Sequence, residues 1–173
     1  MAITRLGPNQ SVNLASNVTG TLPTGNGGTG ATSFSPGKVL QVVQDTHGTA
    51  ITTANPGGAE VDVGVSAAIT PSSSSNKILI IVDAQGQFPA NTGFGNAIIR
   101  GSTAIFQTNN YSNYDSTATQ TNTRASYCYL DSPSTTSSTA YKLQVHAYNP
   151  GTIIQNDGNN KTTMTLMEIE AWL

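Results

Sequence analysis

Side chains able to act as acids, bases or metal ligands are scarce in this sequence of 173 residues. It contains two histidines, His47 and His146, one cysteine, Cys128, and nine acidic residues. No Gly-x-Ser-x-Gly sequence surrounds any serine, so the turn that presents the nucleophile of many serine hydrolases is missing. Asp45 and His47 lie close together, but two neighbouring ligands in a turn do not complete a metal site. We therefore predict no metal and no other cofactor.

The acidic residues include no pair that suits the hydrolysis of a sugar chain. A glycosidase needs two carboxyl groups that face the substrate across a cleft. Glu168 and Glu170 alternate in a predicted strand, so they would lie side by side on one face, and we expect them to point to solvent. We predict no catalytic residue and no enzymatic activity, with a glycan-degrading enzyme as the last alternative.

One polar and aromatic segment has a composition that suits contact with another molecule. Residues 107–117 are rich in Asn, Tyr and Ser and are predicted to form a long loop. A tyrosine ring packs against the apolar face of a sugar, while amide and carboxylate groups form hydrogen bonds with its hydroxyls. A plain solvated loop is the alternative. The candidate contact residues are Asn109, Asn110, Tyr111, Asn113, Tyr114 and Asp115. Residues 85–96, with Phe88 and Phe94, are a second candidate for ligand contact or for contact between subunits.

The composition favours an all-β protein with a surface of hydroxyl and amide groups. Charged residues make up 9% of the chain, and 25 Thr and 17 Ser supply much of its polarity. Threonine favours strands, whereas the residues that populate exposed helix faces are scarce. The formal net charge of −2 gives no basic surface for nucleic acid or for an anionic membrane. Neither nucleic-acid binding nor membrane insertion is expected.

Further expectations concern the cysteine and the start of the chain. A single cysteine excludes an intrachain disulfide, and we predict Cys128 to be a small buried residue. The first residues lack the apolar run of a signal peptide, and no apolar run elsewhere is long enough to span a bilayer. The sequence therefore predicts a protein that is made in a cytoplasm and stays soluble.

Residues 1–36 differ from the rest of the chain because glycine and proline interrupt them repeatedly. Proline lacks an amide donor and glycine permits unusual backbone angles, so regular helix is disfavoured. Isolated apolar residues recur without forming a core of their own: Leu6, Val12, Leu14, Val18 and Leu22. The pattern predicts an extended segment that becomes ordered against a partner, with a disordered tail as the alternative.

Alternating apolar and polar residues follow from residue 38 onward and indicate half-buried strands. Residues 61–69 and 141–147 alternate in this way. Residues 38–44 and 76–84 are partly apolar on both faces, which predicts central strands covered on two sides. Further strands are predicted at residues 97–106, 124–131 and 162–173, with a hairpin turn at residues 156–158. Seven or eight short strands favour a two-sheet β-sandwich or jelly roll over residues 37–173.

A resemblance to a known class of proteins lies in the residues before and within this domain. The stretch Leu-Pro-Thr-Gly-Asn-Gly-Gly-Thr-Gly-Ala-Thr at residues 22–32 resembles a segment that recurs in phage tail fibre proteins. The preceding Val-Thr-Gly-Thr-Leu at residues 18–22 is similar to short units of such fibres. Residues 37–44, 69–79 and 99–105 resemble structural proteins of phages of aquatic bacteria, including cyanophages.

The resemblance implies a virion protein that is assembled in the host cytoplasm. It implies a homotrimer whose N-terminal segment binds another virion protein, such as a tail adaptor, a baseplate protein or the capsid. The C-terminal domain would then face outward and contact a glycan or protein of the host surface. A head fibre or capsid decoration protein without a receptor role is the first alternative, and a tailspike enzyme is the last.

Overall fold

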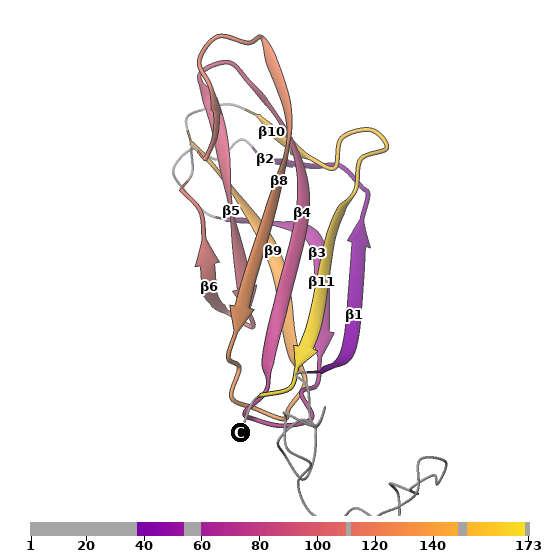
Figure 1. Ribbon diagram of the computed structural model, residues 1–173. Coiled ribbons are helices and arrows are strands. Elements are labelled where there is room, and N and C mark those ends of the chain that lie inside the picture. Colours follow the sequence, from indigo (N-terminus) through magenta and orange to yellow (C-terminus); the bar gives the residue numbers. More distant parts are fainter. Residues whose placement is uncertain (1–37, 54–59, 110–111, 149–151, 172–173) are drawn as a thin grey trace, which may run out of the picture. The chain divides into compact units, whose positions relative to one another are not determined.

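Eleven β-strands make up the regular structure of the described residues (Figure 1). The computed structural model describes residues 38–53, 60–109, 112–148 and 152–171. The predictions for residues 1–36, including Leu6, Val12, Leu14, Val18 and Leu22, therefore lie outside the described residues, as do those for Asn110 and Tyr111.

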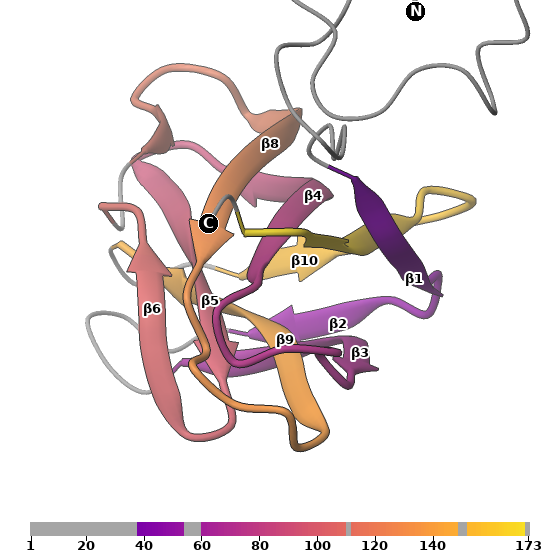
Figure 2. The same cartoon turned by 60° about the horizontal axis from the view of Figure 1, so that its bottom comes forward.

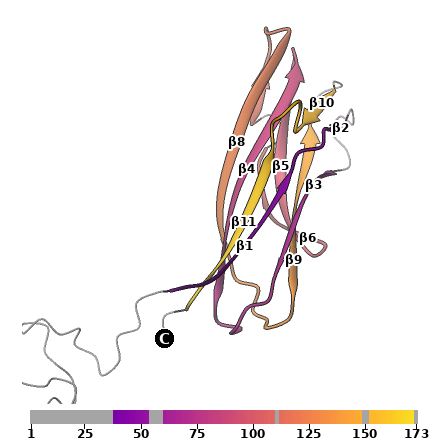
Figure 3. The ribbon, with the colours of Figure 1, turned by 90° about the vertical axis from the view of Figure 1, so that its right-hand side faces the viewer.

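The strands form two sheets that pack face to face, which confirms the predicted β-sandwich (Figures 2 and 3). Every pairing among the described strands is antiparallel. Sheet A contains β1 (Val39–His47), β2 (Ile51–Thr53), β4 (Lys77–Pro89), β8 (Gln120–Asp131), β10 (Ile153–Gln155) and β11 (Thr162–Ile169). Sheet B contains β3 (Val61–Ile69), β5 (Thr92–Arg100), β6 (Thr103–Gln107), β7 (Asn113–Asp115) and β9 (Thr139–Ala147).

Strand β4 organises sheet A because it pairs along its whole length. On one side, its residues Ile78 to Pro89 pair with β8. On the other side it pairs first with β11 and then with β10, and β1 and β2 complete the sheet beyond them. Sheet B runs in the order β3-β9-β5-β6, and β7 also pairs with β5.

The core lies between the sheets and follows the alternation of the sequence. One side of β3 is buried while the other faces solvent, and β4, β9 and β11 show the same pattern. The fully buried side chains include Ile80, Leu143 and Leu166. Phe88 and Phe94 meet edge to face with ring centroids 5.7 Å apart, and both rings belong to the core.

The prediction of two-sided cover for the most apolar strands is wrong. β1 lies at an edge of sheet A, and its Val39, Leu40 and Val42 side chains are exposed. β4 is central, but Ile81 on its outer face is 39% exposed, since no described residue forms a layer outside sheet A. Cys128, which was expected to be buried, is also exposed on this sheet. The outward apolar residues are therefore surface, although the sequence gives them the pattern of a core strand.

One predicted strand and one predicted turn differ in the structure. Residues 97–106 form parts of two strands, β5 and β6, because the chain reverses at Gly101, whose positive φ of 60° suits the first central position of a tight hairpin turn. Residues 156–161, in contrast, do not reverse the chain. β10 and β11 pair with successive parts of the same side of β4. Residues 156–161 therefore leave the sheet between them, and β11 continues in the direction of β10.

Candidate functional site

The register of the strands defines two opposite ends of the sandwich. At the first end, Val39 pairs with Ile169, and Ile169 pairs with Lys77. We call this the chain-start end, because the described chain begins there at residue 38. At the other end of β4, Pro89 pairs with Gln120, and we call this the far end. Since β4 has 13 residues, the two ends are separated by roughly 40 Å at about 3.3 Å per residue.

The candidate contact segment approaches the far end, but it is not one long loop as predicted. β6 ends at Gln107, and residues 113–115 form the short strand β7, which pairs with the first residues of β5. The Thr108 amide donates a hydrogen bond to the Asn96 carbonyl over 3.0 Å. The segment is therefore attached to sheet B at both of its ends.

Two glycines of β5 allow this attachment. A Cβ atom at Gly93 would lie 2.3 Å from the Asn113 carbonyl oxygen, and one at Gly95 would lie 2.4 Å from that of Asn109. Atoms cannot approach so closely, so a side chain at either position would displace backbone. Because Gly93 and Gly95 have no side chain, the backbone of Asn109 and Asn113 can lie close against β5.

Asp115 organises the turn that follows β7. Its carboxylate accepts hydrogen bonds from the backbone amides of Thr117 and Ala118 over 2.8 and 3.0 Å, and from the Thr121 hydroxyl over 3.2 Å. These amide bonds lower the pKa of Asp115 to about 2. The carboxylate is therefore occupied within the domain, which removes Asp115 from the residues offered to a partner.

Tyr114 is the candidate that the structure presents most openly. It is 44% exposed, and its ring lies edge to face against Tyr148 with centroids 5.6 Å apart. Asn109 is exposed as well, while Asn113 is half-buried in β7. Tyr114 and Asn109 are therefore the described candidates that still fit a surface contact.

A hollow of about 350 Å³ lies at the far end, and three of its lining residues fall within the second candidate segment, residues 85–96. Its walls come from β4, from the start of β8 and from β10. They combine amide and hydroxyl groups with apolar surface: Gln87, Phe88, Pro89, Thr119, Gln120, Thr152 and Ile154. No spacing pattern links these positions, because three distant parts of the chain supply them. None of the lining side chains is charged, so the hollow suits a neutral polar group better than an ion.

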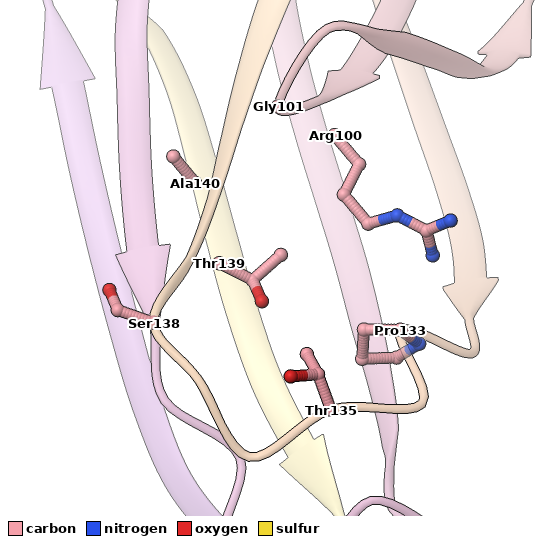
Figure 4. Close-up of a pocket in the computed structure, with 7 residues that line it drawn as sticks. All are labelled: Arg100, Gly101, Pro133, Thr135, Ser138, Thr139 and Ala140. Carbon is pink, nitrogen blue, oxygen red and sulfur yellow. The ribbon is translucent and has the colours of Figure 1, made fainter.

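A second hollow, of about 250 Å³, lies at the chain-start end between the β5–β6 turn and residues 133–140 (Figure 4). The Arg100 side chain extends along one wall toward Pro133 (Figure 4). Its Nη1 lies 2.8 Å from each carboxylate oxygen of Asp131, and the Tyr141 hydroxyl donates to the same carboxylate over 2.7 Å. Asp131 is buried, so this group is an ion pair that secures the end of β8.

Glu168 is buried at the same end, which corrects the expectation that it points to solvent. Its carboxylate accepts hydrogen bonds of 2.6 Å from Gln41, from Asn76 and from the Ser72 amide. Burial would raise the pKa of Glu168, but these hydrogen bonds outweigh it and hold the pKa at about 2. Glu170 lies beyond β11 and is 3.7 Å from the Lys38 ammonium group. The two acids therefore do not form a pair.

Both histidines lie against other residues of the domain. His146 is buried, and its Nε2 lies 3.2 Å from the Thr108 carbonyl oxygen. His47 lies over Gly64, where a Cβ atom would be 2.5 Å from the imidazole Nε2. Within the described ranges, no group of three or more His, Cys, Asp or Glu side chains is placed to hold a metal ion. The same ranges contain no helix long and apolar enough to cross a membrane.

Comparison with known proteins gives similarity to solved structures alone. No protein-family model matches the chain, and no curated protein matches it. A structure of infectious bursal disease virus, Gx strain, is 14% identical with a TM-score of 0.44, over 76% of this chain and 37% of that one. The VP2 subviral particle of the same virus is 10% identical with a TM-score of 0.43, over 75% of this chain and 38% of that one. A T=1 particle derived from the virus is 12% identical with a TM-score of 0.41, over 98% and 42%.

The chain spans about two fifths of the length of these structures. Similarity at this level does not assign a function. The class that the described residues define is an all-β, two-sheet sandwich whose buried acids and histidines hold its own loops in place.

Proposed function

We propose that the chain is a structural protein of a virion, and more specifically a short trimeric phage fibre. Residues 1–36 attach it to a tail adaptor, a baseplate protein or the capsid. The sandwich projects from the particle and contacts a glycan or protein on the host surface.

The observation that carries this proposal is the polarity of the domain. The described chain starts at one end of β4, and the candidate contact segment lies at the other. A domain attached through the residues before Lys38 would therefore hold Tyr114 and the far-end hollow away from the attachment point. The fibre-like sequence at residues 18–32 lies in the segment to which the proposal gives the attachment role.

The chemistry of the described side chains agrees with a binding role better than with a catalytic one. The carboxylates of Asp115, Asp131 and Glu168 are saturated by hydrogen bonds within the domain. The far end instead offers a tyrosine ring and neutral amide and hydroxyl groups. Such groups recognise sugars and polar protein surfaces by stacking and hydrogen bonding.

One observation favours the alternative of a head fibre or capsid decoration protein without a receptor. Asp115 and Asn113, two of the six candidate contact residues, are engaged in the turn and in the strand β7. A receptor-binding role then depends on fewer side chains, with Tyr114 foremost among them.

Substitution at Tyr114 tests the proposal and separates it from this alternative. Particles carrying Tyr114→Ala should contain the normal amount of the protein but adsorb to host cells about tenfold more slowly, because each of several weak contacts is lost at once. Tyr114→Phe keeps the ring and its contact with Tyr148, so it is the matched control and should adsorb nearly normally. Normal adsorption by both variants would favour the decoration protein. Absence of the wild-type chain from purified particles would refute the virion role.

A further inference from the structure

The outer face of sheet A carries apolar side chains where a solvent-facing sheet normally carries polar ones. Val42 of β1 pairs with Met167 of β11, Met167 with Leu79 of β4, and Leu79 with Leu130 of β8. Because directly paired residues point to the same side of a sheet, these four side chains form one row across it. Val42 is 56% exposed and Leu130 is 54% exposed.

The next row adds Ile81 and Cys128, which pair with each other and are both exposed. We call these six residues the outer apolar face: Val42, Leu79, Ile81, Cys128, Leu130 and Met167. The four strands that carry it lie side by side in Figure 1. Strand spacings of about 4.8 Å give the face an area on the order of 300 Å², and an exposed apolar patch of this size is often functional.

Three of the long polar side chains around this face have partners within the domain. Gln44 donates to the Thr165 hydroxyl over 2.8 Å, Lys77 donates to the Ser132 hydroxyl over 2.7 Å, and Arg124 lies 2.6 Å from Asp83. No residue of the face itself is charged. The centre of the outer apolar face therefore offers no group that a strongly charged partner could recognise. A second apolar sheet face could pack against it.

The position of the face favours a second copy of the chain as its partner. Its lowest row lies close to Val39 and Leu40, where the described chain begins. We propose that this face is the surface through which copies of the chain associate, each packing its outer apolar face against that of its neighbours around an axis along the strands. This arrangement keeps residue 38 of every copy at one end. The inference rests on the proposed function in this respect, because a fibre attached through its N-terminal segments needs those segments together.

Charge introduced into the face should separate the copies without unfolding them, because the substituted side chain is exposed in each one. Wild-type full-length protein at micromolar concentration should sediment as an oligomer. Leu130→Glu should sediment at the monomer mass of 17.9 kDa. Ala68→Glu is the matched control, because Ala68 is an exposed position on β3 of the other sheet, and it should keep the wild-type mass.

The reactivity of the Cys128 thiol supplies a second measurement, and no cysteine has to be introduced for it. In the oligomer the thiol is covered, so it should react with a bulky maleimide at least tenfold more slowly in wild-type protein than in Leu130→Glu. A wild-type chain that is monomeric would overturn the inference, and so would a Leu130→Glu variant that keeps the wild-type mass. A monomer with a protected thiol would also overturn it and would assign the cover to the chain's own residues 1–37.

Incorporation into particles distinguishes this inference from the proposed function. A chain that is monomeric in solution yet present in particles contradicts the inference and the trimeric state, but not the virion role. An oligomer that depends on Leu130 but is absent from particles contradicts only the proposed function.

Discussion

Glu168 illustrates how single residues of this domain secure its loops. The carboxylate lies on the inner side of β11 and ties β1 to the loop of residues 70–76 through Gln41, Ser72 and Asn76. A buried carboxylate is stable when donors saturate it, and here four hydrogen bonds do so. The chain-start end is therefore held together by an ionised group.

The first prediction concerns stability at acid pH. The pKa of Glu168 is about 2 in the folded protein, below its ordinary value of 4.5. The unfolded chain therefore binds a proton more readily, and the stabilisation is present above about pH 4.5 and is lost as the pH falls toward 2. Glu168→Gln should lower the free energy of unfolding at pH 7 by roughly 2–4 kcal/mol.

Urea denaturation at pH 7, 5 and 3 measures this effect. The difference between wild-type protein and Glu168→Gln should shrink as the pH falls. Glu170→Gln is the control, because its 3.7 Å ion pair with Lys38 lies at a half-exposed position and is expected to change stability by less than about 1 kcal/mol. A difference that stays constant with pH would show that ionisation of Glu168 does not stabilise the fold.

At the scale of elements, the short strand β7 depends on its neighbour β5. Gly93 and Gly95 leave room for the backbone at residues 109 and 113, and the Asn91 amide donates to the Asp115 carbonyl over 2.8 Å. The start of β5 thus determines where the candidate contact segment lies.

The second prediction is that Gly93→Ala detaches β7 from sheet B. The added methyl group meets a backbone carbonyl that has no flexible side chain to move, so a cost of about 1–3 kcal/mol is expected. Amide hydrogen exchange at Asn91 and in β7 should become at least tenfold faster, while the β4–β8 pairing keeps its protection.

Gly48→Ala is the matched control for this substitution. A Cβ atom there meets only the Lys161 side chain, at 3.4 Å, and that side chain is free to shift. Unchanged exchange in Gly93→Ala would mean that the contact segment does not rely on the glycine.

At the scale of the whole molecule, the sequence predicted the parts of the fold that depend on local patterns. Alternation at residues 61–69 and 141–147 corresponds to β3 and to most of β9, since a side chain's direction in a strand is set by its immediate position. The two-sheet arrangement followed from the number of such strands and the shortage of helix-forming residues.

Features that depend on distant pairing could not be predicted in this way. Val42 and Met167 are neighbours only because β1 pairs with β11, from opposite ends of the domain's sequence. The edge position of β1, the burial of Glu168 and the two-end polarity all follow from that strand order. The strands at residues 38–44 and 76–84 do carry apolar residues on both faces. The outer of these faces is exposed and is not covered by a second layer of described residues.

The candidate site was predictable only in its composition. Residues 107–117 carry the expected polar and aromatic side chains, yet Asp115 is used by a turn and Asn113 by a strand. Which residues stay exposed depends on Gly93 and on Tyr148, which lie far from the segment in sequence. The hollow was predictable only in part, because residues 85–96 supply Gln87, Phe88 and Pro89, while the other lining residues come from distant parts of the chain near β8 and β10.

Electron cryomicroscopy of intact particles can show whether the chain is attached through its N-terminal segment with the far end outward. Particles with the full chain should show projecting density in which each sandwich has Lys38 toward the particle and Tyr114 away from it. Particles made with a chain lacking residues 1–36 should lose this density, although the truncated domain, with its own core, should remain folded. Density that persists after the truncation, or a sandwich with Tyr114 against the particle, would contradict the account.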